Sequence, residues 1–418
     1  MNKNLTGILL FLIFLSIYFW GSFARIPFAD CVGFVLTVEQ GEWMTTATAT
    51  SHFLYVNTAI LIKDIFGLNG IEANRILVLL SAALSVVFVY LSVLSLKANT
   101  LTSAIAAAVF GLSFSFWRNA EIPEVYTYNC LWISLFFLSV IRSFCTEKKI
   151  YIILSGLFLG ISLWLHIQNV LLIPGFFVFL YYMRNEKKEA FLSLALFSAL
   201  FAALFVLNYF QGLQLNSPYS SDQGHWVEDS FKKTLPQYLG DLVKSVFYII
   251  YNYTVFIFFG VVGIFTLYRN NKEMFFVFLF SSFFVYGFST FYAVTDNYVF
   301  FLPFNIVFAI AIGYGMMHRQ KIFRKTYFAV ILIPLFYVFS YFILGHVEKA
   351  KTFGDFKSYK GGLAYYLLPW MNDNKGILEF VIDKKTAPEA VNWMTISAEE
   401  YAELLRSKGF SDQEIREF

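Results

Sequence analysis

Hydrophobic positions in this chain form long runs that short polar segments separate. A run of about 18 apolar residues can cross a bilayer as a helix, because a helix satisfies its own backbone hydrogen bonds. On this criterion we expect about eleven membrane-spanning helices, the first of them retained rather than removed as a leader. Their approximate ranges are 5–23, 75–96, 101–117, 127–144, 151–165, 169–183, 190–210, 243–268, 274–294, 298–317 and 327–344. The pattern predicts an all-α polytopic membrane protein.

Composition supports this class, with 58% hydrophobic, 21% aromatic and 14% charged residues. Such proportions are not those of a soluble enzyme or a nucleic-acid-binding protein. The cysteines, Cys31, Cys130 and Cys145, show no CxxC spacing, and two of them lie in or beside apolar runs. A disulfide framework, a zinc site and redox chemistry are therefore not expected.

The distribution of charge predicts the orientation. If the N-terminus is cytoplasmic, the inner loops hold about twice as many Lys and Arg residues as the outer loops before residue 345, as the positive-inside rule requires. The acids divide the opposite way, and only Glu147, Glu186, Glu189 and Glu273 fall inside. We expect a multi-pass protein of the cell (inner) membrane with an extracytoplasmic C-terminus. Chemistry that uses carboxylates then belongs on the outer face.

Three outer segments are long. The segment 24–74 contains an apolar stretch, 52–66, that suits a helix lying in the membrane interface or re-entering the membrane. The segment 211–242 is rich in Ser, Asn, Asp and Gly, and it is either a lid, an acceptor-facing surface or a solvated connector. Hydrophobicity falls after residue 345. We therefore divide the chain into a transmembrane domain, 1–345, and an extracytoplasmic tail, 346–418.

The tail carries two patterns typical of helix N-termini. Ser397 and Ser411 are each followed three residues later by Glu, which is the capping-box spacing. We expect two short helices there. The tail either packs on the outer face or binds the acceptor.

Acidic residues at the outer ends of the spans are the best candidates for chemistry. They are Asp30, Glu121, Glu124 and Asp296, and they could converge on one cavity. A partly buried carboxylate with a raised pKa can deprotonate a hydroxyl group. Arg25, Arg75 and Arg118 lie on the same predicted face, and guanidinium groups suit phosphate because their planar fork donates two hydrogen bonds. The combination is typical of group transfer from a lipid phosphate.

Each candidate also has a structural interpretation. Asp30 could be a solvated residue, Glu124 could form an ion pair with Arg118, and Glu121 favours a structural role more strongly. Asp296 could cap the helix that follows it. His166 could bond only to the backbone, and His52 and His225 carry a weaker signal. No spacing demands a metal, so a divalent cation stays open.

Three stretches of the chain form a recognisable set of motifs. The first is EVY at 124–126 with Asn129, preceded by Phe116-Trp117 and Ala120. The second is GISLWLH at 160–166, followed by Pro174. The third is Asp296 with FFLP at 300–303, followed by Gly313 and Gly315. Together they resemble the GT-C superfamily of membrane glycosyltransferases, in the branch similar to protein O-mannosyltransferases, and the order and spacing agree across roughly residues 1–345.

The resemblance implies a GT-C-like helical arrangement with a long first outer loop. It also implies transfer of a sugar, with mannose as the candidate, from a polyprenyl-phosphate donor to a hydroxyl on protein, lipid or glycan, usually with inversion. The acid of the first outer loop, Asp30, is the expected catalytic base. The expected donor-binding residues are Arg75, Arg118, Glu124, Tyr126, His166 and Asp296.

Two other classes stay open. A transporter or flippase of a lipid-linked or small polar substrate also uses paired helices and polar groups in the membrane, but it should place ionisable residues near the bilayer midplane. The acids here cluster at one face, which favours a surface enzyme. An inactive scaffold that recruits partners through its tail is the third interpretation.

Overall fold

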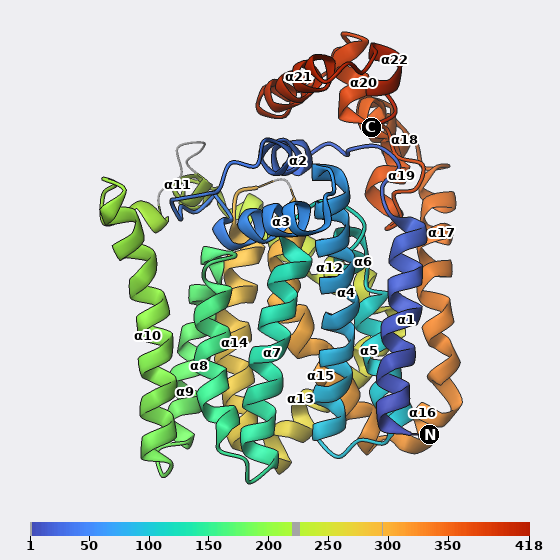
Figure 1. Ribbon diagram of the computed structural model, residues 1–418. Coiled ribbons are helices and arrows are strands. Elements are labelled where there is room, and N and C mark those ends of the chain that lie inside the picture. The colour runs from blue at the N-terminus through green and yellow to red at the C-terminus, as the bar shows by residue number, and fades with distance from the viewer. Residues whose placement is uncertain (1, 220–225, 295) are drawn as a thin grey trace.

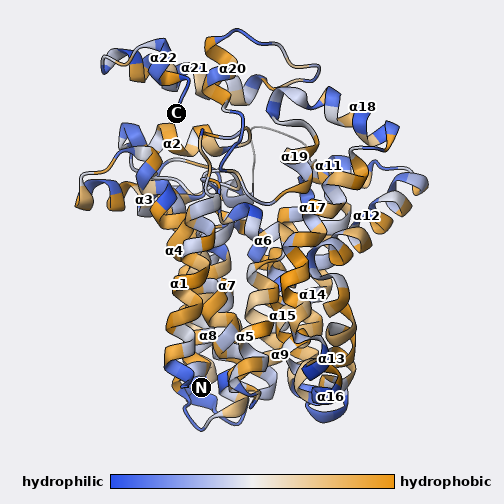
Figure 2. Ribbon diagram, turned by 90° about the vertical axis from the view of Figure 1, so that its right-hand side faces the viewer, coloured by the Kyte–Doolittle hydropathy of each residue, from blue (hydrophilic) through white to orange (hydrophobic). Residues whose placement is uncertain are grey.

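The computed structural model describes residues 2–219, 226–294 and 296–418, and no strand occurs among them. Hydrophobic residues dominate the shaft of the bundle, and hydrophilic residues gather at its two ends and in the C-terminal helices (Figure 2). Eight helical stretches in the described residues are long and apolar enough to cross a membrane. They are α1 (Lys3–Gly21), α4 (Gly70–Ser95), α7 (Tyr126–Cys145), α10 (Lys187–Phe210), α12 to α13 (Leu235–Asn270), α14 (Lys272–Phe291), η4 with α15 (Asn297–His318) and α16 to α17 (Gln320–Leu344).

The other three expected spans are shorter apolar helices, so the count of eleven is not confirmed. They are α5 (Thr100–Gly111), α8 (Ile150–Ser162), and η1 (Ile167–Leu172) followed by α9 (Ile173–Tyr182). The expected run 101–117 is interrupted at Leu112 and Ser113 and continues as α6 (Phe114–Asn119). The Tyr337 hydroxyl donates to the Leu112 carbonyl over 2.9 Å, which satisfies backbone that the interruption leaves free.

Two helices from the first long segment lie across one end of the bundle, which we call the loop side (Figure 1). They are α2 (Cys31–Gln40) and α3 (Phe53–Phe66). The expected short helix at 52–66 is therefore present as α3. Two small elements, η2 (Ser217–Tyr219) and α11 (Trp226–Phe231), belong to the second long segment. The N-terminus lies at the opposite end of the bundle (Figure 1).

The tail lies over the loop side (Figure 1). Its buried residues, Ile377 and Tyr401 among them, form one hydrophobic cluster with Phe28 and Val35 of the first segment. The Ile377 amide also donates to the Ile26 carbonyl over 3.0 Å. The tail elements are α18 (Glu348–Phe356), η6 (Ser358–Lys360), α19 (Gly362–Leu367), α20 (Ile377–Ile382), α21 (Asn392–Ser407) and α22 (Asp412–Ile415).

One of the two expected helix starts in the tail is wrong. Ser411 does cap α22 through a complete capping box. Ser397, however, lies inside α21, which begins at Asn392. Met394, in the added first turn, packs against the buried cluster of the first segment. Tertiary packing therefore extends the helix beyond its local capping signal.

Candidate active site

Three carboxylates from separate parts of the chain meet on the loop side. Asp30 precedes α2, Glu124 lies between α6 and α7, and Asp296 precedes η4. Burial, followed by the nearby charge of Asp296, raises the pKa of Asp30 to about 6. Burial, followed by the charges of Asp30 and Asp296, raises the pKa of Glu124 well above its usual range. Like charges at such proximity are typical of functional sites rather than of structural ion pairs.

The three acids differ in solvent contact. Glu124 is only 4% exposed, whereas the side chains of Asp30 and Asp296 reach solvent. The protein atoms around both aspartates nevertheless raise their pKa values by burial. Each side chain is therefore partly enclosed by protein and open to solvent on one side. A recessed acid that solvent can reach is available to a substrate.

The backbone before Asp30 holds an unusual conformation. Ala29 has φ +120°, a region that residues with a side chain rarely adopt. Its amide donates to the Met394 sulfur of α21 over 3.3 Å. The Glu124 carboxylate in turn accepts from the Asp30 backbone amide and from the Cys31 thiol over 3.7 Å. Contacts from both sides therefore fix the conformation that presents Asp30.

Asp296 does not act as a helix cap. It occupies the N-cap position of η4, but its side chain makes no capping hydrogen bond. Its carboxylate is instead close enough to Lys360 of the tail and Lys244 of α12 for their charges to lower its pKa against the larger effect of burial. The capping interpretation is therefore not what the structure shows.

Arg118 is a buried cation without an ion-pair partner in the described part of the chain, although its charge acts on Glu121 from a longer distance. Its residue surface is 2% exposed, and its guanidinium lies 4.2 Å from the centroid of the Tyr365 ring. It also donates to the Leu368 carbonyl over 3.4 Å. No carboxylate of the described residues lies within 4.0 Å of Arg118, so the expected alternative of an ion pair with Glu124 is not formed. A buried cation in this state is costly unless an anion joins it.

Tyr126 and His166 border the carboxylates. Tyr126 lies within electrostatic range of all three acids, and its ring centroid is 5.9 Å from that of His166. Burial, followed by the neighbouring His52, lowers the pKa of His166 to about 3, so the ring is neutral. Its Nδ1 accepts from the Gln168 amide over 3.3 Å. His166 is therefore bonded to backbone and also faces the site.

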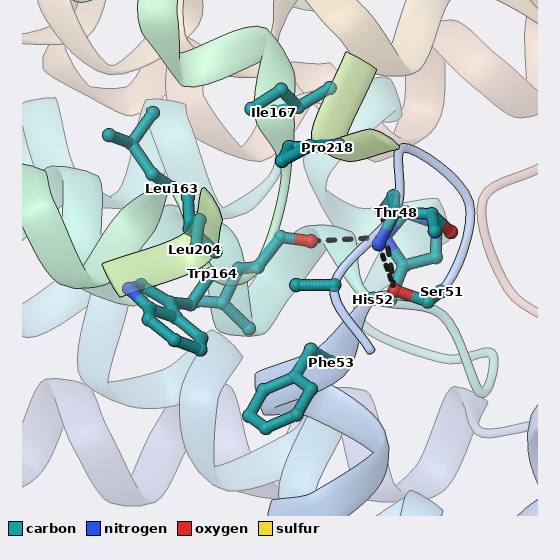
Figure 3. A pocket seen from close by; sticks show the side chains of 11 residues that line it. Thr48, Ser51, His52, Phe53, Leu163, Trp164, Ile167, Leu204 and Pro218 are labelled. Atoms are coloured by element: carbon teal, nitrogen blue, oxygen red, sulfur yellow. Dashed lines mark hydrogen bonds between the residues drawn. The ribbon is translucent and has the colours of Figure 1, made fainter. Parts of the chain in front are cut away.

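A small cavity lies beside His52, and Trp164 and Leu204 are among the residues that line it (Figure 3). Its volume is about 10 Å³, enough for a single water molecule. The His52 ring is bonded through Nδ1 to the Leu165 carbonyl, 3.0 Å away, and its centroid is 5.3 Å from that of His166. His52 thus supports the wall of the site. His225 lies outside the described residues.

Arg75 and Glu121 have partners of their own. Arg75 donates to the Phe23 carbonyl over 2.8 Å and lies 4.3 Å from the centroid of the Phe23 ring, although its Nε has no hydrogen bond. Its role as a phosphate ligand stays a prediction. Glu121 accepts from the Trp117 indole and from the Met371 amide, the latter over 3.0 Å. Arg25 forms ion pairs with Glu379 and Glu417 of the tail.

Several groups at the site were not expected from the sequence. Lys360, Tyr365 and Tyr366 come from the tail, where basic and aromatic residues follow one another closely from 357 to 366. That run indicates a cationic, aromatic surface, but it does not indicate which residues the tail contacts. No group of three or more His, Cys, Asp or Glu side chains in the described part of the chain is arranged to hold a metal ion.

Comparison with solved structures identifies the architecture. ArnT from Cupriavidus metallidurans in the apo state superposes with a TM-score of 0.57 at 12% identity, over 100% of this chain and 74% of that one. ArnT bound to undecaprenyl phosphate gives 0.55 at 12% identity, over 98% and 74%. The oligosaccharyltransferase of Archaeoglobus fulgidus in the apo form gives 0.56 at 12% identity, over 96% of this chain but 59% of that one. The fold is that of GT-C glycosyltransferases.

A family model covers part of this GT-C fold. Residues 44–190 match the model described as the protein O-mannosyl-transferase TMEM260 N-terminal domain. That range contains Arg118, Glu124, Tyr126 and His166 and leaves out Asp30. Curated protein sequences gave no match. The expected resemblance to GT-C enzymes is confirmed for the fold.

Proposed function

We propose that this protein is a membrane glycosyltransferase that moves a sugar from a polyprenyl-phosphate donor to an acceptor hydroxyl on the loop side. The convergence of Asp30, Glu124 and Asp296 carries this proposal, together with the buried Arg118, whose charge acts on the same Tyr365 side chain as that of Asp296. Carboxylates supply a base, and an unpaired guanidinium supplies a place for phosphate. The matched family description favours mannose as the sugar and a protein hydroxyl as the acceptor.

Asp30 is the proposed base. Its recessed but accessible carboxylate takes the proton from the acceptor hydroxyl. The acceptor oxygen then forms a bond to C1 of the sugar, while the bond from C1 to the phosphate oxygen breaks. One displacement of this kind inverts the configuration at C1. The other product is polyprenyl phosphate.

Arg118 is the proposed ligand of the departing phosphate. Negative charge grows on the leaving oxygen as its bond to C1 breaks, and a fixed cation in a water-poor site stabilises that charge. Glu124 holds the Asp30 loop through the Asp30 amide. Asp296, Tyr126 and the neutral His166 line the donor side. The bound undecaprenyl phosphate of one ArnT structure supports a lipid-phosphate donor for this fold.

The proposal also sets an orientation. Polyprenyl-linked sugars reach GT-C-like sites laterally from the bilayer, so the loop side should face the extracytoplasmic space. The excess of Lys and Arg on the opposite side supports this orientation. A cysteine-labelling assay on intact cells, with single cysteines in α21 and in the 146–149 loop, tests it.

The activity test uses the purified full chain in lipid nanodiscs. Radiolabelled polyprenyl-phosphate mannose is incubated with a Ser/Thr-rich peptide, and transfer to peptide and release to water are both measured. Asp30→Asn should lower the transfer rate by about 10²–10⁴-fold, the range typical of a lost general base. The matched control is Asp64→Asn, since Asp64 is an exposed acid of α3 in the same segment.

The proposal fails if wild-type protein neither transfers nor hydrolyses any polyprenyl-phosphate sugar offered. If Asp30→Asn folds normally and keeps full activity, the enzyme assignment survives but the base is another residue. Equal losses in Asp30→Asn and Asp64→Asn would point to a general loss of folding.

A further inference from the structure

Lys360 is placed at the site by a sharp turn in the tail. Gly361 and Gly362 have φ of +114° and +60°, conformations that favour glycine. The Gly362 amide donates to the Lys357 carbonyl over 3.0 Å, which closes the turn. The reversal brings Lys360 to 5.3 Å from the centroid of the Tyr365 ring.

Tyr365 therefore has two cations on one ring. The Arg118 guanidinium lies 4.2 Å from its centroid, and the Lys360 ammonium lies 5.3 Å from it. No carboxylate in the described part of the chain forms an ion pair with either cation. Two cations beside one aromatic ring repel each other, although Glu389 and Asp296 act on Lys360 from a longer distance. A bound anion that contacts both cations would relieve this repulsion.

The segment that carries Lys360 is tied to the loop of the proposed base. The Tyr365 hydroxyl donates to the Phe28 carbonyl over 3.2 Å, and the Tyr359 ring lies 5.3 Å from that of Phe28. Glu389 binds Lys357 in an ion pair and accepts from the Tyr359 hydroxyl. Lys360 is thus positioned relative to Asp30 by the packing of tail on loop.

We propose that Lys360 and Arg118 form a two-cation phosphate site that binds the polyprenyl phosphate product more tightly than the sugar-linked donor. This inference rests on the proposed function. The donor is a phosphodiester with one negative charge, whereas the released phosphate monoester carries about 1.5 to 2 charges at neutral pH. A second cation therefore gains most as the C1–oxygen bond breaks. Interactions that strengthen toward the transition state raise the catalytic rate.

The titration of Lys360 adds a signature. Burial, followed by the charge of Lys357, lowers the pKa of Lys360 to about 8, while Glu389 and Asp296 oppose the shift and Arg118 adds to it. Product affinity should accordingly fall as the pH rises through about 8. The charged and titratable groups facing Lys360 are Lys357, Glu389, Asp296, Arg118, Tyr359, Tyr365 and Tyr366.

The experiment measures binding to the full chain in nanodiscs, without turnover. The probes are undecaprenyl phosphate, undecaprenyl-phosphate mannose and undecaprenol, which has no phosphate. Lys360→Gln should weaken the binding of undecaprenyl phosphate by about tenfold or more, which is the value of a lost charge-assisted hydrogen bond. It should weaken the binding of the sugar-linked donor by less. Lys360→Arg should keep the affinity and move its decline to a pH well above 8. Lys349→Gln, which removes an exposed lysine of α18, is the matched control.

The outcomes separate the two proposals. If wild-type protein binds undecaprenyl phosphate no better than undecaprenol, the proposed donor class fails and this inference fails with it. If wild type binds it and Arg118→Gln abolishes binding while Lys360→Gln has no effect, the proposed function stands and the role of Lys360 is overturned. Equal losses for donor and product in Lys360→Gln would overturn the preference for product.

Discussion

Two groups of buried charge lie within a few residues of each other around α6, and they are built differently. The Glu121 carboxylate accepts from the Trp117 indole and the Met371 amide, so its donors come from α6 and the tail. Arg118 contacts the Tyr365 side chain and donates one long bond to the Leu368 carbonyl. The Glu121 carboxylate accepts two hydrogen bonds, whereas Arg118 has no ion-pair partner within 4.0 Å among the described residues. The difference indicates that Glu121 holds the fold together and that Arg118 waits for a ligand.

The three acids belong with Arg118 in this comparison. Burial raises the pKa values of Asp30 and Glu124, and the charge of Asp296 raises both further. Burial also raises the pKa of Asp296, although Lys360 and Lys244 oppose that shift. A protein that needed only stability would not gather like charges at a recessed position. The contrast between satisfied and unsatisfied charge can be tested directly.

Removing Arg118 should produce the largest effect on activity with the least effect on folding. Arg118→Gln should lower kcat/KM for the lipid-linked donor by about 100-fold or more, because the phosphate loses its buried partner. The melting temperature should not fall, since an uncompensated buried charge has been removed. Steady-state kinetics and thermal unfolding in nanodiscs measure both. If Arg118→Gln lowers the melting temperature but leaves the kinetics per folded molecule normal, then Arg118 has a structural role and does not bind the donor.

Removing Glu121 should do the opposite. Glu121→Ala leaves the Trp117 indole and the Met371 amide without an acceptor, and each orphaned donor costs about 1–3 kcal/mol of unfolding free energy. Gly21→Ala should act in the same direction, because an added Cβ would meet the Glu121 Oε1 atom at 1.9 Å. Thermal unfolding and activity per folded molecule are the measurements. If Glu121→Ala loses activity but keeps its stability, Glu121 belongs to the site.

The pH dependence of kcat/KM should show a smaller effect, which comes from Asp30 and Asp296. Asp30 must be ionised to act as a base, so kcat/KM should fall about tenfold per pH unit below its pKa of about 6. Asp296→Asn should move this acidic limb to lower pH, because the charge of Asp296 helps to raise the pKa of Asp30. If the acidic limb of the Asp296→Asn profile lies at the same pH as in the wild type, then either Asp30 is not the base or Asp296 does not affect its pKa.

Stability should change with pH in the opposite sense. The pKa of Asp30 in the folded protein, about 6, lies above its ordinary value of 3.8. The folded state therefore favours the protonated carboxyl. The stabilising contribution is complete below about pH 4 and is lost as the pH rises through about 6.

Arg75 should give the smallest effect. Its guanidinium already lies against the Phe23 ring and donates to the Phe23 carbonyl. We expect Arg75→Gln to change donor KM by less than about threefold, since Arg75 is only half-buried, whereas Arg118 is almost fully buried. Steady-state kinetics of Arg75→Gln, measured together with those of Arg118→Gln, test this expectation. A loss as large as that of Arg118→Gln would restore Arg75 as a phosphate ligand.

The sequence predicted the membrane helices and the meeting of the three acids for different reasons. Long apolar runs specify spanning helices locally, which is why eight of the expected spans are present as long helices. Asp30, Glu124 and Asp296 could be grouped because each lies at the same predicted end of a span. The expected span 101–117 is not one continuous helix, because polar contacts from distant residues, among them Tyr337, stabilise an interruption.

The contribution of the tail could not be predicted. Lys360 and Tyr365 follow the last span and carry no signal of which residues they contact. Their position depends on the packing of α20 and α21 against Phe28 and its neighbours, which is a long-range event. The start of α21 at Asn392 instead of Ser397 has the same origin. Local patterns specify helices well, but they do not specify which helices meet.

The docking of the tail on the first long segment has a consequence for biosynthesis. Chains emerge from the ribosome N-terminus first, so the Asp30 loop is made long before Lys360 and the helices that cover it. During that interval the loop has no tail cluster to fix the strained conformation at Ala29. A nascent chain therefore contains Asp30, Glu124 and Asp296 before Lys360 has been synthesised. Under the proposed function, the site would be complete only after the last-made segment has packed on the Asp30 loop.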